Sequence, residues 1–219
     1  MFLLLHICYA LVGCAAAGFG GDQSHNITLY SEADNTGEQI TFTSFSHDLS
    51  LDGFNDKTHS MCGVGAWILY KNEDYQYDEN SWTTLFTAGQ YKCYTLGASR
   101  AQQASSLRYV GSGDLDDQVL TIYYDYAWSG GEMTVIRDQD DLGGYGNHGA
   151  SFTITGNGSW TVYSGVYFTG ESLCVKPTAD PMSGKFFGAW DVRNLQLPAD
   201  MISSIRKGCF SNRVVSYSG

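Results

Sequence analysis

Positive charge is scarce in this sequence. Lysine and arginine together number 12 of 219 residues against 23 aspartate and glutamate residues, and the formal net charge is −11. Nucleic-acid binding needs a basic surface, and docking on an anionic membrane needs clustered basic residues. The sequence therefore argues against both kinds of partner. An acidic chain stays soluble at high concentration, and its carboxylates suit calcium.

Motifs for catalysis and for transition metals are missing as well. No Cys-x-x-Cys occurs, so a zinc site or a thioredoxin-like redox site has little support. The 5 histidines stand in no His-Glu-x-x-His frame, and Gly-x-Ser-x-Gly is absent. The acidic stretch at residues 114–117 lacks the glycine and the distant glutamate of an EF-hand loop. We therefore predict that the protein is not an enzyme.

Long apolar runs are missing after residue 17. Residues 1–17 carry apolar runs and end in three alanines, the small-residue pattern of a signal-peptide cleavage site. The run is short for a transmembrane span. Because no lysine or arginine precedes it, a buried N-terminal strand or helix is the alternative. We interpret residues 1–17 as a secretory signal peptide and predict a secreted, extracellular protein without a transmembrane segment. Asn26 and Asn157 each begin an Asn-x-Ser/Thr glycosylation sequence.

Helical periodicity is almost absent, and strand patterns take its place. β-branched and aromatic residues alternate with polar ones, which is typical of half-buried strands. These runs lie at residues 27–30, 39–42, 67–70, 119–123, 152–155 and 160–163. Turn residues separate them, and the chain has 26 glycines. Short strands at this spacing predict an all-β sandwich or barrel.

A tyrosine followed seven positions later by glycine recurs along the chain. The complete copies are Tyr30 with Gly37, Tyr123 with Gly130, and Tyr163 with Gly170, and in a fourth copy Tyr77 takes the glycine position after Tyr70. The first two tyrosines are 40 residues apart, as are the last two, whereas 53 residues separate the pairs. Tyr70 and Tyr163 also share a Trp-x-x-Tyr frame with Trp67 and Trp160. The folding unit is therefore a pair of repeats, and a propeller with even spacing is disfavoured.

The repeat predicts two domains. We place domain 1 at residues 24–110, a Gly- and Asp-rich linker at residues 111–118, and domain 2 at residues 119–210. Residues 177–184 resemble a loop inserted in the last repeat. Four cysteines follow the signal peptide, and an even count in a secreted chain indicates disulfides. Three pairings are open, with buried free thiols as the alternative, but the repeat favours one bond in each domain, Cys62–Cys93 and Cys174–Cys209.

The tyrosine and glycine of each repeat suit a tight hairpin. Glycine supplies the positive φ that other residues resist, and the aromatic ring can lie over the hairpin and shield it. One hairpin cannot bury its own apolar face, but two such units facing each other can.

Taken together, the Tyr-x6-Gly motif, the serine-rich turns and both Trp-x-x-Tyr frames resemble the βγ-crystallins over about residues 24–210. The resemblance implies two Greek-key motifs of four strands in each domain, packed as a wedge of two sheets. With its signal peptide, the chain is similar to extracellular members of the family rather than to lens proteins.

The resemblance also implies calcium binding at turns with the pattern Asn/Asp, Asn/Asp, x, x, Ser/Thr, Ser, two of which cross within a domain. The four turns lie at residues 55–60, 101–106, 147–152 and 199–204, and none has the full pattern. His59 takes the fifth position of the first turn, and imidazole is a poor calcium ligand. The shared ligand sets that we predict are Asn55, Asp56 and Ser105 in domain 1, and Asp200 with Ser151 and Asn147 with Ser203 in domain 2. The alternative is that these serines only cap backbone amides.

Two functions follow from the resemblance. The first is a secreted structural or interaction protein of a matrix, a secretion or an epithelial surface, with calcium as its ligand. The second is a recognition or defence protein, either a subunit of a toxin complex or a protease inhibitor. An inhibitor needs a rigid exposed loop, for which residues 177–184 are the candidate. Pairing of the domains within one chain or between chains, as a homo- or hetero-oligomer, is open.

Overall fold

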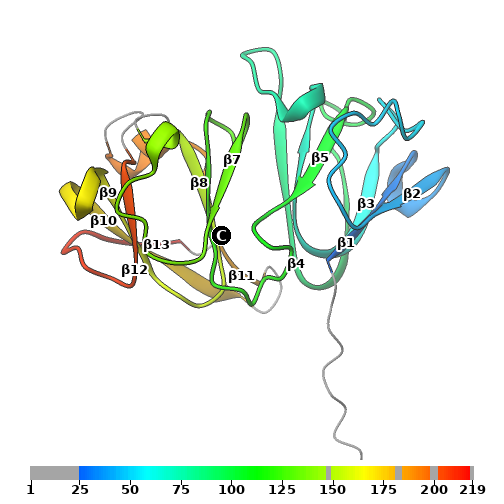
Figure 1. The fold of residues 1–219 in the computed structure, drawn as a ribbon. Coiled ribbons are helices and arrows are strands. Elements are labelled where there is room, and N and C mark those ends of the chain that lie inside the picture. The colour runs from blue at the N-terminus through cyan, green and yellow to red at the C-terminus, as the bar shows by residue number, and fades with distance from the viewer. Residues whose placement is uncertain (1–24, 147–148, 181–183, 198–201, 218–219) are drawn as a thin grey trace, which may run out of the picture.

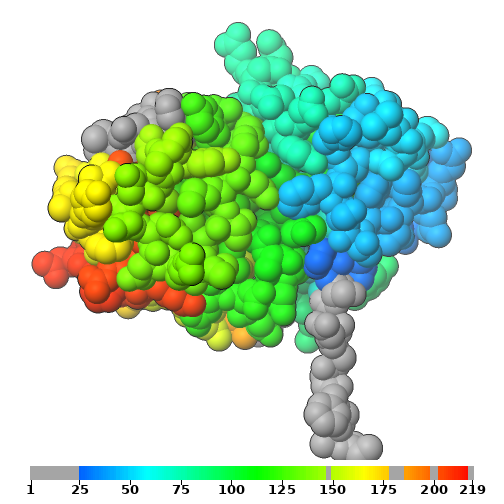
Figure 2. Space-filling model, in the orientation of Figure 1, coloured from blue at the N-terminus to red at the C-terminus, as the bar shows by residue number. Residues whose placement is uncertain are grey.

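The computed structural model describes residues 25–146, 149–180, 184–197 and 202–217. The predicted signal peptide lies outside these residues. Their regular structure consists of strands and short 3-10 helices, which confirms the all-β fold class. Two β-domains lie side by side and are joined by the segment between β5 and β6 (Figure 1). The space-filling view shows them packed against each other over a broad front (Figure 2).

Domain 1 is built from one continuous sheet that folds over on itself. Its order is β2-β1-β3-β4, with β5 also paired to β3. β1 pairs with residues 60–64 of β3, whereas β5 pairs with residues 67–70. A register shift at Gly63 and Gly65 divides the two halves of β3, so that they form two packed layers. The strands are β1 (Asn26–Tyr30), β2 (Gln39–Phe42), β3 (Ser60–Tyr70), β4 (Thr83–Thr95) and β5 (Ser106–Tyr109).

Domain 2 repeats this plan with an additional C-terminal strand. Its order is β12-β9-β10-β11-β8-β6-β7, and β13 pairs with β10 in parallel. The strands are β6 (Leu120–Tyr123), β7 (Glu132–Val135), β8 (Ser151–Thr155), β9 (Trp160–Gly165), β10 (Thr169–Asp180), β11 (Gly184–Ala189), β12 (Ser204–Lys207) and β13 (Val214–Tyr217).

The structure corrects the interpretation of residues 177–184 as a loop. Residues 178–180 belong to β10, and their backbone pairs with β11. Residues 181–183 lie outside the described residues. In the part that the structure describes, the candidate inhibitory loop is therefore two paired strands of a sheet.

Each domain has its own apolar core, and a third cluster joins the two. Trp67 and Trp160, the tryptophans of the Trp-x-x-Tyr frames, are fully buried in the cores of domains 1 and 2. Every residue of β3 is buried, because its two faces have different partners. Trp67 and Leu69 face the core of domain 1, whereas Ile68 and Tyr70 join a cluster that includes Tyr123 of domain 2. Side chains that alternate along a strand explain this division.

Both disulfides favoured by the repeat are present. Cys62 and Cys93 lie directly opposite each other on β3 and β4, with their Cα atoms 4.0 Å apart. Cys174 on β10 is bonded to Cys209, at a Cα–Cα distance of 5.1 Å. Each bond ties together segments of a single domain.

Candidate functional site

The four repeats form hairpins of the same backbone shape. In each, the fourth and fifth residues after the motif tyrosine are left-handed, with φ between 52° and 62°. The glycine seven positions after the tyrosine has a φ of 71° to 83° in the three complete copies. In the second repeat Tyr77 holds this position without a positive φ. The left-handed pairs are Asp34–Asn35, Asp74–Tyr75, Ala127–Trp128 and Tyr167–Phe168.

A serine from the following turn closes each hairpin. Its hydroxyl donates to a backbone carbonyl of the hairpin and accepts the N–H of the second left-handed residue. Ser60, for example, donates to the Glu32 carbonyl at 2.6 Å and accepts from the Asn35 N–H at 2.9 Å. The equivalent serines of the other repeats are Ser106, Ser151 and Ser204. These serines occupy the sixth position of the turn pattern.

This geometry corrects the prediction that Ser151 holds the fifth, ligand position. The fifth residue of each turn donates its N–H to the carbonyl of the motif tyrosine, and in the third repeat Ala150 does so, to Tyr123 at 3.2 Å. The other three such residues are His59, Ser105 and Ser203. The Ser151 hydroxyl is bonded to the Asp125 carbonyl and the Trp128 N–H. The predicted register of this turn was therefore one residue off.

The two turns of domain 1 cross, as the resemblance implies. The Asp56 N–H donates to the Ala104 carbonyl at 3.0 Å, and the Gln102 N–H donates to the Thr58 carbonyl at 2.7 Å. These reciprocal bonds bring Asp56 next to the turn that carries Ser105. The predicted domain 1 residues are thus on facing segments.

Two side-chain oxygens in the first turn, Thr58 Oγ1 and Asn55 Oδ1, are shielded from solvent and lack a hydrogen-bond partner among the described residues. The Asn55 side-chain amide donates to an Asp56 carboxylate oxygen at 3.2 Å. Its Oδ1 is buried and accepts no hydrogen bond from the described residues. Such an atom costs free energy unless something satisfies it. A cation is one such partner.

The donor set fits calcium better than a transition metal. Asn55, Asp56 and Ser105 offer amide, carboxylate and hydroxyl oxygens, which calcium prefers, and backbone carbonyls and water can complete its six to eight ligands. Among the described residues, no three histidine, cysteine, aspartate or glutamate side chains are grouped so that they could hold a metal. Only one carboxylate is present in the set, so these residues fit a weak calcium site.

The domain 2 turns are only partly described. Asn147 and Asp200 lie outside the described residues. Ser203 occupies the fifth position, and its hydroxyl donates to the Ser164 carbonyl at 3.1 Å. A calcium site in domain 2 therefore stays a prediction.

The two glycosylation sequences differ in accessibility. Asn157 is exposed in the turn between β8 and β9. Asn26 is half-buried in β1, where it is paired with Val64. Asn157 is thus the more accessible acceptor, and modification of either residue stays a prediction.

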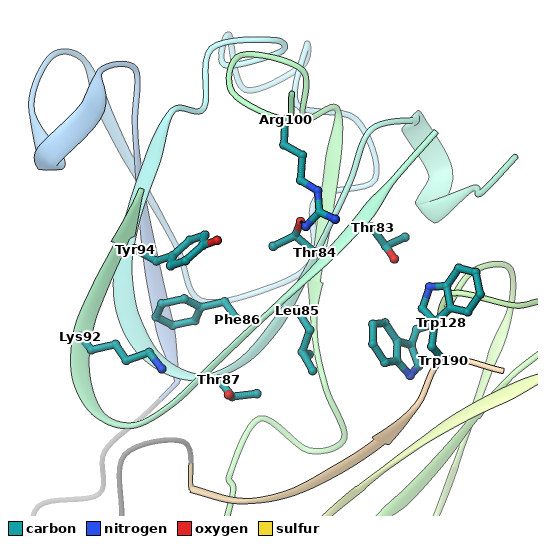
Figure 3. Close-up of a pocket in the computed structure, with 10 residues that line it drawn as sticks. All are labelled: Thr83, Thr84, Leu85, Phe86, Thr87, Lys92, Tyr94, Arg100, Trp128 and Trp190. Carbon is teal, nitrogen blue, oxygen red and sulfur yellow. Dashed lines mark hydrogen bonds between the residues drawn. The ribbon is translucent and has the colours of Figure 1, made fainter. Parts of the chain in front are cut away.

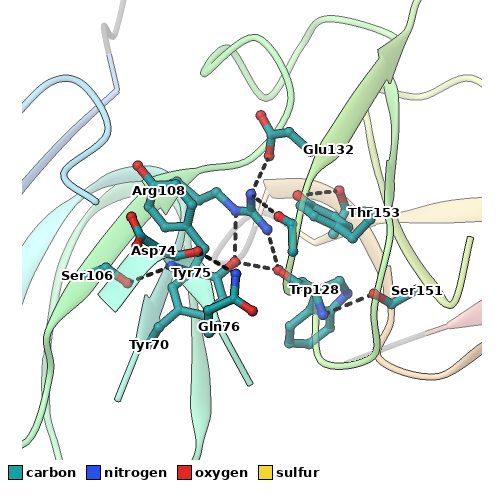
Figure 4. A network of polar contacts seen from close by, with 12 residues as sticks. Tyr70, Asp74, Tyr75, Gln76, Ser106, Arg108, Trp128, Glu132, Ser151 and Thr153 are labelled. Atoms are coloured by element: carbon teal, nitrogen blue, oxygen red, sulfur yellow. Dashed lines mark hydrogen bonds and ion pairs between the residues drawn. The ribbon is translucent and has the colours of Figure 1, made fainter. Parts of the chain in front are cut away.

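The most elaborate polar site is one that sequence reasoning missed, at the contact between the domains. Arg108 on β5 is buried, and its guanidinium donates to the Tyr70 hydroxyl at 2.8 Å (Figure 4). It also donates across the interface to the carbonyls of Trp128 at 2.5 Å and Gly130 at 3.1 Å. Glu132 lies 3.3 Å from it. One arginine thus joins both domains.

Aromatic rings enclose this guanidinium and set the electrostatics of the site. The Arg108 Cζ atom is 4.7 to 5.3 Å from the ring centres of Tyr70, Tyr75 and Tyr123, a cation–π arrangement. Burial raises the pKa of Tyr70 and Tyr123, so both hydroxyls stay neutral. Burial also raises the pKa of Glu132, by more than the positive charge of Arg108 lowers it.

A weak signal for Arg108 exists in the sequence. The second and fourth repeats both continue from their serine as Ser-x-Arg, at Arg108 and Arg206. Arg206 lies over Phe168, just as Arg108 lies over Tyr75 at the same repeat position. The pattern places an arginine on the hairpins of the second and fourth repeats, but it does not show which of the two meets another domain.

Comparison with known proteins finds a family match for domain 1. Residues 26–110 match the family model described as Beta/Gamma crystallin. A 124-residue stretch, 56% of the chain, is 31% identical to the epidermal differentiation-specific protein of Cynops pyrrhogaster. The match covers 34% of that relative, so the chain spans about a third of its length.

The solved structure of Geodin, a beta-gamma crystallin from Geodia cydonium, resembles both domains together. It has a TM-score of 0.61 at 16% identity, and it covers 84% of this chain and 99% of its own. This likeness shows the fold. No helix in the described part of the chain is long and apolar enough to span a membrane.

Proposed function

Since residues 26–110 belong to the βγ-crystallin family and the two domains together have its fold, we propose that this chain is a secreted structural or interaction protein. It acts in an extracellular matrix, a secretion or an epithelial surface. Calcium binds to the crossed turns of domain 1. The single observation that carries the calcium proposal is the buried, unpartnered Asn55 oxygen beside Asp56.

Several features support an extracellular setting. Residues 1–17 have the pattern of a signal peptide, and the two disulfides suit an oxidising compartment. The net charge of −11 suits a protein that stays soluble at high concentration. The relative from Cynops pyrrhogaster is named for epidermal differentiation, which favours an epithelial surface among these settings.

Calcium titration of the EDTA-treated, signal-free protein tests the metal proposal. We expect saturable heat in isothermal calorimetry and a higher melting temperature, because a ligand that prefers the folded state stabilises it. The affinity should be lower than that of a site with several carboxylates. Absence of both heat and a thermal shift would contradict calcium binding and leave a disulfide-stabilised scaffold.

Two variants locate the site. Asp56→Asn removes the charge but keeps a residue that tolerates the left-handed backbone, since Asp56 has a φ of 53°. Asp34→Asn is its control, with the same charge change in the hairpin at a φ of 55°. We expect Asp56→Asn to remove the thermal shift and Asp34→Asn to retain it. An equal loss in both would point to general charge screening instead of a site.

A further inference from the structure

One edge of the domain 1 sheet is unpaired. Along residues 83–88, β4 pairs with β3 on one side. On its other side, these residues make no backbone hydrogen bond within the described part of the chain. Unpaired edges are templates for another strand, and proteins usually protect them.

The neighbouring hydrogen bonds show which backbone groups face this edge. The Lys71 N–H donates to the Trp82 carbonyl, so this opposing pair is a hydrogen-bonded one. Hydrogen-bonded pairs alternate along an antiparallel ladder, so the backbone groups of Thr84 and Phe86 also point to β3. Those of Thr83, Leu85 and Thr87 therefore point away from it, to the free edge.

Bonds on the far side of β3 agree with this assignment. The carbonyls of Ala66 and Tyr70 accept from Val110 and Ser105, toward β5. The residues between them, Trp67 and Leu69, therefore direct their backbone groups to β4, where they are paired with Phe86 and Thr84.

A groove with a volume of about 450 Å³ lies along this edge (Figure 3). It is lined by five consecutive residues of β4, residues 83–87. Successive side chains of a strand point to opposite faces, so a groove on one face would contact only every second residue. Contact with all five indicates that the groove follows the edge of the strand.

The wall on the Thr84 and Phe86 side is cationic. Arg100 donates to the Thr84 hydroxyl at 2.9 Å, and the Lys92 Nζ is 5.9 Å from the centre of the Phe86 ring. Neither cation forms an ion pair with a carboxylate of the described residues. No aspartate or glutamate lines the groove, although the chain carries a net charge of −11.

The opposite wall is aromatic and comes from domain 2. Trp128 and Trp190 line the groove on the side to which Leu85 points (Figure 3). Trp128 and Leu85 belong to the cluster that joins the domains. The groove thus combines a cationic wall, a row of unpaired backbone groups and an apolar wall.

We propose that this groove binds an extended acidic peptide segment of a partner protein by strand addition to β4. Backbone groups of the segment pair with Thr83, Leu85 and Thr87. Side chains on one face of the added strand are acidic and meet Lys92 and Arg100. Those on the other face are apolar and meet the tryptophans, so acidic and apolar residues alternate in the segment.

Charge complementarity selects this occupant over a second copy of the chain. A symmetric contact between two β4 edges would place the same two cations on both sides, without added carboxylates. The acidic surface of each copy would also oppose association. This site is separate from the calcium turns, so its test does not depend on calcium binding.

The probe is a seven-residue peptide of alternating glutamate and valine with blocked ends, titrated into ¹⁵N-labelled protein and followed by NMR. We expect saturable shifts of the Thr83, Leu85 and Thr87 amides, and slower hydrogen exchange of these amides on binding. The Thr84 and Phe86 amides should be protected in the free protein. A peptide with lysine in place of glutamate should not bind. A glutamate–valine peptide with N-methyl groups on its pairing amides should bind about tenfold or more weakly, because each lost hydrogen bond weakens binding.

Variants of the protein test the two walls and the edge. The double variant Lys92→Glu/Arg100→Glu should bind the peptide about tenfold or more weakly, whereas Arg137→Glu, at an exposed arginine outside the groove, should bind normally. Thr87→Pro removes an N–H that points to the free edge, so it should abolish binding of the peptide. The variant should still fold, because proline is tolerated on edge strands. Its melting temperature shows whether it folds.

Four results would overturn the proposal. The first is equal binding of the N-methylated peptide, which would mean that charge alone attracts it. The second is unchanged binding by Lys92→Glu/Arg100→Glu. The third is saturable binding of an acidic oligosaccharide at these amides with no binding of the peptide. The fourth is a concentration-dependent dimer that protects the same amides.

Discussion

At the scale of the residue, one serine hydroxyl closes each hairpin. Ser60, Ser106, Ser151 and Ser204 each donate one hydrogen bond and accept another from the backbone. From the sequence, the serines of these turns have two possible roles, as calcium ligands and as caps of backbone amides. For the sixth-position serine the structure shows the capping role.

Replacing one of these serines should therefore be costly. Ser106→Ala leaves the Asn72 carbonyl and the Tyr75 N–H without the hydroxyl that both contact. We expect a loss of about 1–3 kcal/mol in the free energy of unfolding, measured by urea denaturation. Ser99→Ala, at an exposed serine, is the control and should change stability by less than about 0.5 kcal/mol. Equal effects would contradict the role of the Ser106 hydroxyl.

At the scale of the element, the hairpins show what glycine contributes. A Cβ on Gly170 would lie 2.4 Å from the Ser164 Oγ, and the φ of this residue is 79°. The Ser164 hydroxyl accepts the Glu171 N–H, so it cannot move without losing that bond. The second repeat departs from this pattern, and the ring of Tyr77 instead lies 5.6 Å from that of Trp190 in domain 2.

Gly170→Ala tests this account. Strain from the positive φ and displacement of Ser164 should lower the free energy of unfolding by about 1–3 kcal/mol. Gly97→Ala is a matched control, since a Cβ there meets nothing within 4 Å and its φ is not in the left-handed range. It should be neutral or slightly stabilising. Urea denaturation of both variants measures the difference, and equal stability would show that the hairpin adapts.

Much of this element structure is predictable from the sequence, because it depends on local patterns. Alternation of apolar and polar residues predicts β1 and β9, and the spacing of Tyr-x6-Gly predicts the hairpins and the pairing of repeats. The turn register of the third repeat was not predictable from local patterns, because Ser151 is the only serine there and fits two positions. Arg108 was missed because a lone arginine on a strand normally faces solvent, and its partners are distant in sequence.

At the scale of the whole molecule, one guanidinium connects the two domains. Arg108 donates to Tyr70 in its own domain and to the carbonyls of Trp128 and Gly130 in the other. A buried arginine is tolerated only where its donors are satisfied. The apolar cluster around it and this network together fix the contact between the domains.

Arg108→Leu should weaken that contact. It leaves two carbonyls and Glu132 without their donor, at a cost of about 3–5 kcal/mol. We expect scanning calorimetry to show two separate transitions in place of coupled unfolding. Arg206→Leu removes the equivalent residue of domain 2, whose ion pair with Asp138 is partly exposed, and should cost about 1 kcal/mol or less. A single, unshifted transition for Arg108→Leu would contradict this account.

The stability of the molecule should also depend on pH through Glu132. Its raised pKa means that the folded protein keeps this proton at pH values where the unfolded chain has lost it. Stability from this group is therefore lost as the pH rises through the range just above the ordinary pKa of 4.5. Between about pH 4 and about pH 7, we expect the wild type to lose unfolding free energy relative to Glu132→Gln in urea titrations. A relative gain would show that attraction by Arg108 outweighs burial.

The contact between the domains joins two unlike faces. A joint of that kind, repeated, builds an open-ended fibre. One half of this contact, an arginine packed over an aromatic ring of its own domain, recurs in domain 2, where Arg206 lies over Phe168. The other half is the first hairpin of a domain. In domain 1 this hairpin has Asn35 and Gln39 at the repeat positions that Trp128 and Glu132 hold in domain 2. Because the first hairpin of domain 1 lacks both the tryptophan ring and the carboxylate, we expect that chains do not polymerise end to end through this contact.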